Sequence, residues 1–283
     1  MNFIEAIFQY DFLQKALITS IMVGVICGVI GCFIILRGMS LMGDAISHAV
    51  LPGVAISYLL GINFFIGAVA TGLLTALGIG FVSQNSRIKN DTAIGILFTS
   101  AFALGIILIS FLRSSSDLYH ILFGNVLAVR PSDMWMTLII GILVLGGIYL
   151  FYKELLVTSF DPTMAAAYGL STRFIHYLLM MMLTLVTVAS LQTVGIILVV
   201  AMLITPAATA YLLTNRLSRM IFLSASFGTI SAIIGLYLSF TYNLSSGASI
   251  VLVATALFAL VFIFSPRHGL IRKWKTSTKE VAS

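Results

Sequence analysis

The stretch ALITSIMVGVICGVIGCFIIL (residues 16–36) decides the class of protein, because it contains no charged side chain. A helix crosses a membrane with about 20 mostly apolar residues, so this stretch is long enough to span. Working outward, similar segments follow at about 41–60, 62–82, 93–112, 134–152, 174–191, 194–214, 220–240 and 247–264. The sequence therefore predicts an all-α, polytopic membrane protein with eight or nine transmembrane helices. Eight remains open because the turn at Gly61 is short and the segment after Arg37 begins with polar residues.

Composition excludes an ordinary soluble enzyme. Of the 283 residues, 60% are hydrophobic and 8% are charged, whereas a soluble domain carries about 25% charged residues. Lipid must therefore cover much of the surface. No long soluble insertion interrupts the chain, so residues 1–283 form a single transmembrane domain. We expect no removable signal peptide, and we expect Cys27 and Cys32 to pack as small apolar side chains.

The placement of basic residues predicts the orientation in the membrane. With nine crossings and the C-terminus in the cytoplasm, three of the 15 Lys and Arg residues lie outside, namely Lys15, Arg113 and Arg130. The positive-inside rule favours this arrangement, with the N-terminus outside. The basic tail at 266–283 then acts as a cytoplasmic topology anchor. The residues that fall inside are Arg37, Arg87, Lys89, Lys153, Arg173, Arg216, Arg219, Arg267, Arg272, Lys273, Lys275 and Lys279.

Two connections are longer than a tight turn. The outer one contains DLYHILFGNVLAV (117–129), which can form a short helix on the membrane surface. The inner one reads KELLVTSFDPTMAAAYGLSTR (153–173). Here Ser159 or Asp161 can cap a short helix, Pro162 suits its first turn and Gly169 suits its end. A capped helix on the cytoplasmic face is suited to docking a soluble partner, although an ordinary capped loop also fits.

The residues with the most chemistry lie in SLMGDAISHAVLPGVA (40–55), at the start of an apolar segment. Asp44 and His48 are spaced i, i+4, so on a helix they share one face about 6 Å apart along the axis. Ionisable groups at membrane depth usually line an interior or a watery path. One carboxylate and one imidazole make half of a site for Mn²⁺, Zn²⁺ or Fe²⁺, and a symmetric dimer would supply two of each.

Simpler interpretations also fit these residues. Asp44 can cap the second helix, and His48 can be a buried, satisfied histidine. Gly38, Gly43, Gly53 and Pro52 favour a binding site, because they permit the broken backbone that transporters use. The remaining histidines, His120, His176 and His268, are interpreted as interfacial, with a vestibule or partner contact as the alternative for His120.

Motifs of catalysis are largely absent from the sequence. It contains no GxxxxGK[ST] phosphate loop, no HExxH zinc-protease motif and no GxSxG elbow. We therefore expect a transport subunit rather than an enzyme, with no permanently bound cofactor. Two alternatives remain. One is a secondary metal transporter that works alone, which uptake without any ATPase would support. The other is a membrane-embedded metalloenzyme, which would need a tightly held metal and catalytic turnover.

Four stretches in order resemble the permease subunits of manganese, zinc and iron ABC importers, most closely those for manganese in Gram-positive bacteria. They are RGMSLMGDAISHAVLPGVA (37–55), DLYHILFGN (117–125), LLVTSFDPTMAAAYGL (155–170) and VGIILVVAMLITPAATA (194–210). The resemblance implies a type II importer fold in the bacterial cell membrane. It implies a second permease copy, two copies of an ATPase subunit and an extracellular metal-binding lipoprotein as partners, with Mn²⁺, or alternatively Zn²⁺ or Fe²⁺, as cargo.

The resemblance also assigns roles to residues. The metal-binding Asp and His of the family fall on Asp44 and His48. The segment 159–170 corresponds to the coupling helix that docks on the ATPase, with Asp161, Ala165, Ala166 and Gly169 in it. The short outer helix corresponds to 117–129, so Asp117, His120 and Asn125 are expected to contact the binding protein.

Overall fold

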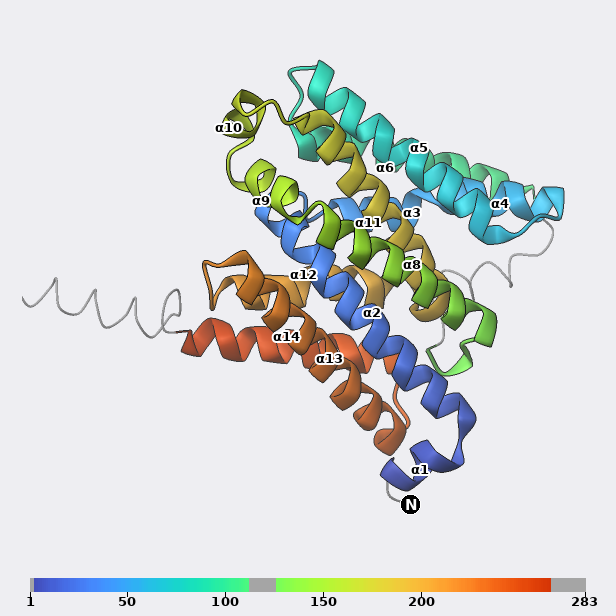
Figure 1. Ribbon diagram of the computed structural model, residues 1–283. Coiled ribbons are helices and arrows are strands. Elements are labelled where there is room, and N and C mark those ends of the chain that lie inside the picture. Colours follow the sequence, from blue (N-terminus) through green and yellow to red (C-terminus); the bar gives the residue numbers. More distant parts are fainter. Residues whose placement is uncertain (1–2, 112–125, 266–283) are drawn as a thin grey trace, which may run out of the picture.

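A computed structural model describes residues 3–111 and 126–265, and within them the regular elements are all helical (Figure 1). In chain order they are α1 (Phe3–Gln9), α2 (Asp11–Leu36), α3 (Met42–Ala49), α4 (Leu51–Leu60), α5 (Phe64–Asn85), α6 (Asn90–Ser110), the 3₁₀ turn η1 (Val126–Ala128), α8 (Pro131–Leu150), α9 (Tyr152–Phe160), α10 (Pro162–Ala167), α11 (Thr172–Val194), α12 (Ile196–Tyr211), α13 (Leu217–Tyr242) and α14 (Ser246–Phe264).

The expected all-α membrane fold is confirmed. In the described part of the chain, eight segments are long and apolar enough to cross a membrane, with α3 and α4 together forming one of them. The ninth apolar segment is α12, a helix of 16 residues. At 1.5 Å per residue it is shorter than the hydrocarbon core of about 30 Å. The count is thus eight full-length spans and one shorter apolar helix.

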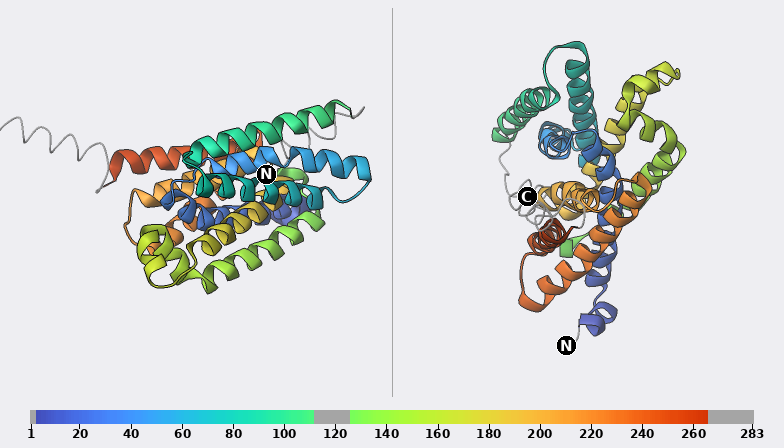
Figure 2. Two further views of the ribbon diagram at one scale, coloured as in Figure 1. Left: turned by 90° about the horizontal axis from the view of Figure 1, so that it is seen from above. Right: turned by 90° about the vertical axis from the view of Figure 1, so that its left-hand side faces the viewer.

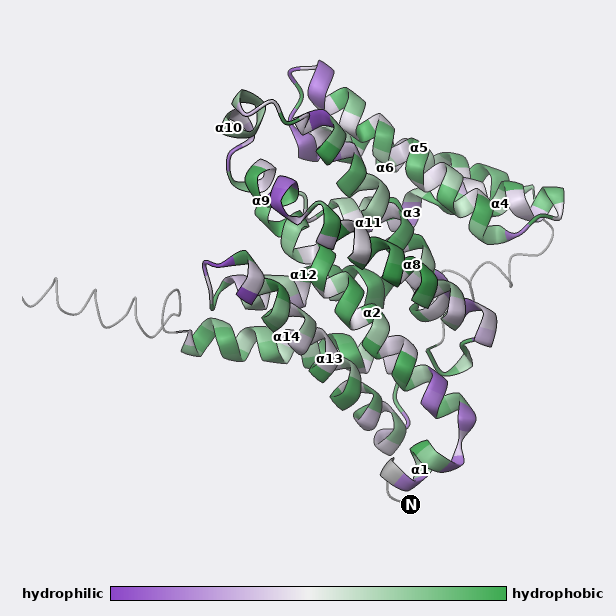
Figure 3. Cartoon of the chain, in the orientation of Figure 1, coloured by the Kyte–Doolittle hydropathy of each residue, from purple (hydrophilic) through white to green (hydrophobic). Residues whose placement is uncertain are grey.

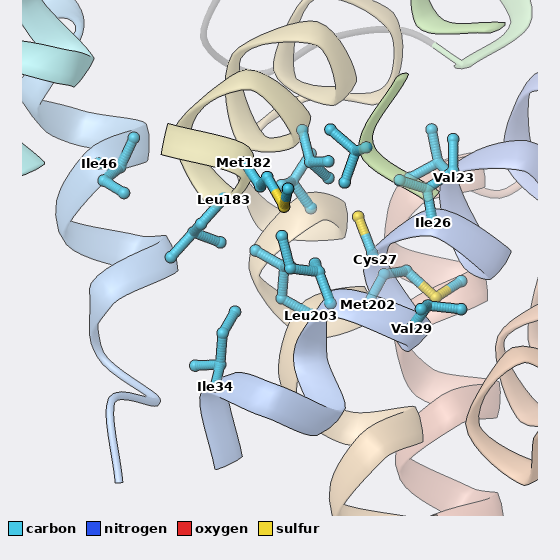
Figure 4. Packing of buried hydrophobic residues seen from close by; sticks show 14 of the residues in the cluster. Val23, Ile26, Cys27, Val29, Ile34, Ile46, Met182, Leu183, Met202 and Leu203 are labelled. Atoms are coloured by element: carbon cyan, nitrogen blue, oxygen red, sulfur yellow. The ribbon is translucent and has the colours of Figure 1, made fainter. Parts of the chain in front are cut away.

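The bundle is built around α2. This helix packs against α12, α13 and α8, and Figure 1 shows it crossing the middle of the molecule. Its side chains Ile30, Cys27 and Phe33 are completely buried. Figure 4 shows Cys27 and Val23 near side chains of α11 and α12. Viewed from the side, α5 with α6 and α13 with α14 lie on opposite sides of the bundle (Figure 2, right).

Polar residues gather at the ends of the bundle, and the middle is apolar (Figure 3). Three connections lie toward the same end of the bundle, on the upper and left-hand side of Figure 1. They are the α5–α6 turn, the α9–α10 segment and the α12–α13 turn. These three connections carry basic residues that the positive-inside rule places in the cytoplasm, among them Arg87, Lys153 and Arg216. The arrangement therefore brings together the charges that the sequence assigns to one side.

The structure differs from the sequence-based expectations in three elements. The N-terminal helix α1 was not expected. Residues 152–160, expected as part of a connection, form α9. The segment at 41–60 is not one helix, because the chain is interrupted at Val50 between α3 and α4. Pro52 in the first turn of α4 has no N–H to continue the preceding helix, which accounts for the interruption. The expected outer helix at 117–129 lies mostly outside the described residues, as does the tail at 266–283.

Close contact between α4 and α5 depends on two glycines. A Cβ atom on Gly53 would collide with the backbone carbonyl oxygen of Gly67. Small residues at such crossings let membrane helices approach closely. Gly53→Ala is therefore expected to destabilise the protein by about 2–3 kcal/mol, since the backbone must move to relieve the overlap. The measurement is thermal unfolding of the purified protein in detergent.

Gly146→Ala is the matched control for this prediction. Gly146 is also helical, in α8, but a Cβ there would meet no atom within 4 Å. Alanine has the higher helix propensity, so this variant should unfold at the same temperature or above. Equal melting temperatures for Gly53→Ala and the unmodified protein would contradict the close packing of α4 on α5.

Candidate metal-transport site

The helix α3 carries both candidate ligands and begins directly after a sharp turn. Gly38 has a positive φ of 65°, a conformation that glycine adopts without strain. The N-cap of α3 is Leu41, which makes no side-chain capping bond, and Asp44 lies in the first helical turn. Asp44 is therefore not the cap that the simpler interpretation suggested.

The α3–α4 break lies next to His48. In a continuous helix the carbonyl of His48 would accept a bond from the N–H of residue 52. Proline occupies that position and has no N–H, and the His48 carbonyl instead accepts a bond from the N–H of Val50.

Asp44 and His48 lie together on one face, as their spacing predicted. The distance from His48 Nε2 to Asp44 Oδ1 is 3.5 Å, and the side chains are 30% and 44% exposed, respectively. Both groups line a cavity of about 560 Å³. His48 is therefore not a fully buried histidine. An oxygen and a nitrogen ligand atom face the same cavity, and both belong to the segment Met42–Leu60, which is long and apolar enough to span a membrane.

The opposite wall of the cavity is almost entirely apolar. It is formed by α12, with Leu51 and Phe102 contributing from α4 and α6. Apart from Thr205, this wall carries no polar side chain, so Asp44 and His48 are the charged or imidazole groups that line the cavity. The lining residues of α12 are Ile196, Ile197, Val200, Ala201, Ile204 and Thr205.

Two phenylalanines of α6 hold the imidazole of His48. The ring centroids of His48 and Phe98 are 5.6 Å apart with a tilt of 57°, and those of His48 and Phe102 are 5.5 Å apart in an edge-to-face arrangement. Such pairs stabilise a defined ring orientation. The sequence analysis did not find Phe98, Phe102 or the α12 wall, because nothing in the local pattern of α6 or α12 distinguishes these residues from ordinary spanning-helix residues.

The chain by itself forms a partial ligand set. Within residues 3–111 and 126–265, no group of three or more His, Cys, Asp or Glu side chains is placed to hold a metal ion. Asp44 and His48 together provide two ligands, and manganese takes about six. The arrangement therefore suits transient contact with an ion better than permanent binding.

The short helix expected within 159–170 is present as α10. The Asp161 side chain accepts a bond of 2.9 Å from the N–H of Met164, which makes Asp161 its N-cap and lowers the pKa of that carboxyl. Pro162 occupies the first turn, and Gly169 has a positive φ of 79° after the helix. Ser159, the alternative cap, instead donates to the carbonyl of Leu155.

The four residues expected at the ATPase contact do not share one environment. Ala166, Asp161 and Gly169 are exposed, whereas Ala165 is completely buried. Two large apolar side chains beside Ala166 are also exposed, Met164 at 51% and Tyr168 at 74%. A surface of this kind is typical of a contact with another protein. Ala165 instead fixes α10 against the rest of the chain.

The other sequence-based site residues have different outcomes. Asp117, His120 and Asn125 lie outside the described residues, so their expected contact with a binding protein stays a prediction, and His268 also lies there. His176 was expected at the interface, but its Nε2 atom is buried and has no hydrogen-bond partner in the described parts of the chain. Cys27 and Cys32 are buried free thiols, as predicted.

Comparison with known proteins identifies the family of the chain. The model of the ABC 3 transport family matches residues 9–265. The chain is 72% identical over 271 residues to the "Manganese transport system membrane protein MntC" of Listeria innocua, covering 96% of this chain and 97% of the relative. A protein of the same name from Halalkalibacterium halodurans is 66% identical over 275 residues, covering 96% and 94%.

A solved structure is also similar. "PsaBC from Streptococcus pneumoniae in complex with Fab" contains a chain that is 56% identical and superimposes with a TM-score of 0.85. The match covers 94% of this chain and 96% of that one. The similarity extends over almost the full length of both proteins, so it includes α3, α10 and α12.

Proposed function

The chain belongs to the ABC 3 transport family, and from this premise we propose that it conducts Mn²⁺ across the bacterial membrane by way of Asp44 and His48. It is the multi-pass permease subunit of a manganese importer, as its relatives named for manganese transport indicate. The observation that carries the site is the pair itself, since the carboxylate and the imidazole lie 3.5 Å apart and line one cavity.

A second copy of the chain would complete the ligand set. Symmetric dimers place the same surface of both copies on the axis. If the α3 faces meet there, two Asp44 and two His48 side chains surround one ion. Water would supply the remaining oxygens that manganese needs. Because these ligands come from two chains, movement of the copies would make and break the site, as transport requires.

We propose that energy for transport enters through α10. The exposed surface of Met164, Ala166 and Tyr168 is the docking surface for a cytoplasmic ATPase subunit, with one ATPase per permease copy. This arrangement places the C-terminus in the cytoplasm and the N-terminus outside, in agreement with the distribution of basic residues. An extracellular metal-binding lipoprotein would then deliver the ion on the side of the outer connection.

Uptake by reconstituted proteoliposomes tests this function. The chain and its ATPase are inserted together, and radioactive Mn²⁺ accumulation is measured with and without ATP on the cytoplasmic side. We expect accumulation only when the ATPase and ATP are both present. Uptake by the chain alone would instead support a stand-alone transporter. Preferred accumulation of zinc or iron under the same conditions would leave the architecture intact but contradict manganese as the cargo.

Zinc is expected to inhibit manganese uptake at this site. Zn²⁺ binds nitrogen and oxygen ligands more tightly than Mn²⁺ does, and it accepts four of them. A dimeric site with two carboxylates and two imidazoles would therefore hold zinc too long for rapid release. The measurement is the initial rate of Mn²⁺ uptake with equimolar Zn²⁺, using binding protein already loaded with manganese so that zinc acts on the permease.

Mg²⁺ at the same concentration is the control ion, because it is harder and avoids imidazole. We expect an unchanged rate with Mg²⁺ and a reduced rate with Zn²⁺. Equal rates with both ions would show that the transport site does not present nitrogen ligands to the metal.

A further inference from the structure

Arg37 lies at the point where the central helix turns toward the metal site. It follows the last residue of α2 and precedes Gly38, whose positive φ begins the turn to α3. The turn is held by backbone bonds, since the N–H of Met39 donates to Ile34 and that of Met42 donates to Met39, both at 3.0 Å. A displacement of Arg37 is therefore passed on to the start of α3.

The guanidinium of Arg37 reaches across to α9. Its Nε donates to Ser159 Oγ at 3.0 Å, and its Nη2 donates to Thr158 Oγ1 at 2.6 Å. The two hydroxyls in turn donate to carbonyls of their own helix, at 2.6 and 2.7 Å. Their protons are thus used within α9, and their lone pairs are available to Arg37. A planar guanidinium suits this forked arrangement, which a lysine cannot reproduce.

These two bonds connect the proposed ATPase-docking segment to the rest of the protein. In the described part of the chain, no other side-chain hydrogen bond joins residues 152–170 to the remaining elements. The helices α9 and α10 contact each other and meet at Asp161. A movement of α10 therefore moves α9. The hydrogen bonds of Arg37 then connect α9 to the end of α2.

The surroundings of Arg37 offer it no competing anchor. Among the described residues, no carboxylate oxygen lies within 4.0 Å of its guanidinium. Two other polar side chains are close to this region: His176, which lies near Arg37, and Glu154, one turn before Thr158. Each has a buried polar atom without a hydrogen-bond partner in residues 3–111 and 126–265. Burial lowers the pKa of Arg37 to about 10, so the group remains charged at neutral pH. Its position thus depends on Thr158 and Ser159.

We propose that Arg37 is a positioning residue that transmits movement of α9 and α10 to α3, and so couples ATP hydrolysis to the exposure of Asp44 and His48. This inference rests on the proposed function, because it assumes an ATPase docked at α10. Coupling between distant sites needs a contiguous physical connection whose equilibrium both sites bias. Arg37 supplies that connection from one side of the α2–α3 turn.

The test measures manganese imported per ATP hydrolysed by the reconstituted permease–ATPase complex. Arg37→Gln is expected to retain ATPase assembly and hydrolysis while the ratio falls about tenfold, within the range of allosteric couplings. Thr158→Val combined with Ser159→Ala should lower the ratio similarly, because it removes the same two bonds from the other side. Arg37→Lys should recover part of the ratio, since an ammonium can still donate to one hydroxyl.

Arg87→Gln is the control, because Arg87 is an exposed arginine at the same end of the bundle. It should leave the ratio unchanged. An unchanged ratio in Arg37→Gln, or an equal loss of hydrolysis and uptake, would overturn the inference. If Arg37→Gln fails to assemble, the paired hydroxyl variant decides in the same way. Failure of the unmodified complex to import manganese would instead contradict the proposed function, so the two failures are distinguishable.

Discussion

Asp44→Asn and His48→Gln are each expected to lower manganese uptake by about a hundredfold or more, since loss of even an outer-shell partner of a metal ligand costs 10–100-fold. Asp44→Asn keeps the size of the side chain but removes the negative charge of the carboxylate, and His48→Gln removes the imidazole nitrogen. The α12 wall of the cavity is apolar apart from Thr205, so no second carboxylate or imidazole lines the cavity to replace the lost ligand. Asp44→Ala and His48→Ala should have the same effect. The measurement is ATP-dependent Mn²⁺ uptake by proteoliposomes.

Asp91→Asn is the matched control for the carboxylate. Asp91 also lies in the first turn of a spanning helix, α6, but it is exposed at the end of the bundle. Its replacement should leave uptake unchanged. All variants should still assemble with the ATPase, because Asp44 and His48 are partly exposed and do not belong to the buried core. Normal uptake by both ligand variants would end the hypothesis that the ion passes between them.

Ala166→Glu is expected to release the ATPase or to reduce ATP-driven uptake about tenfold or more, because an unpaired charge in an apolar contact is costly to desolvate. Ala166 is exposed between Met164 and Tyr168, so the new side chain does not disturb α10 itself. The buried Ala165 is unsuitable for this test, since a charge there would disrupt the packing of α10. Gly169 is also unsuitable, because its positive φ strains any other residue.

Ala166→Ser is the conservative control and should behave like the unmodified protein. Ser86→Glu places the same charge on the exposed α5–α6 turn at the same end of the bundle, away from α10. Two measurements should distinguish Ala166→Glu from these controls. One is co-purification of the ATPase with the permease, and the other is ATP-driven Mn²⁺ uptake. Cross-linking that locates residues 159–170 on the outer face would refute the docking role and the orientation together.

Features that depend on neighbouring residues along the chain could be predicted from the sequence. The i, i+4 pairing of Asp44 with His48 follows from helical periodicity alone. The helix α10 follows from Asp161, Pro162 and the glycine after it, each of which has a local conformational reason. The interruption at Val50 was not predicted as such, although Pro52, which has no backbone N–H, marked this region as one where the helix can break.

Features that depend on tertiary contacts could not be predicted in this way. Phe98 and Phe102 enclose His48 only because α6 packs on α3 and α4. In a chain where most residues are apolar, hydrophobic periodicity does not reveal which face of α6 or α12 lines a cavity. The bonds from Arg37 to Thr158 and Ser159 join residues that are far apart in the sequence, so neither partner shows a pattern of its own.

The most direct test is to observe the ligands of the ion. Mn²⁺ is paramagnetic, so electron–nuclear double resonance on the permease–ATPase complex reports nitrogen nuclei bound to it. We expect a histidine nitrogen signal from manganese trapped in one nucleotide state, loss of that signal in His48→Gln, and release of the ion in another state. A stoichiometric, slowly exchanging manganese in every state, retained when Asp44 and His48 are both replaced, would contradict transport through this site.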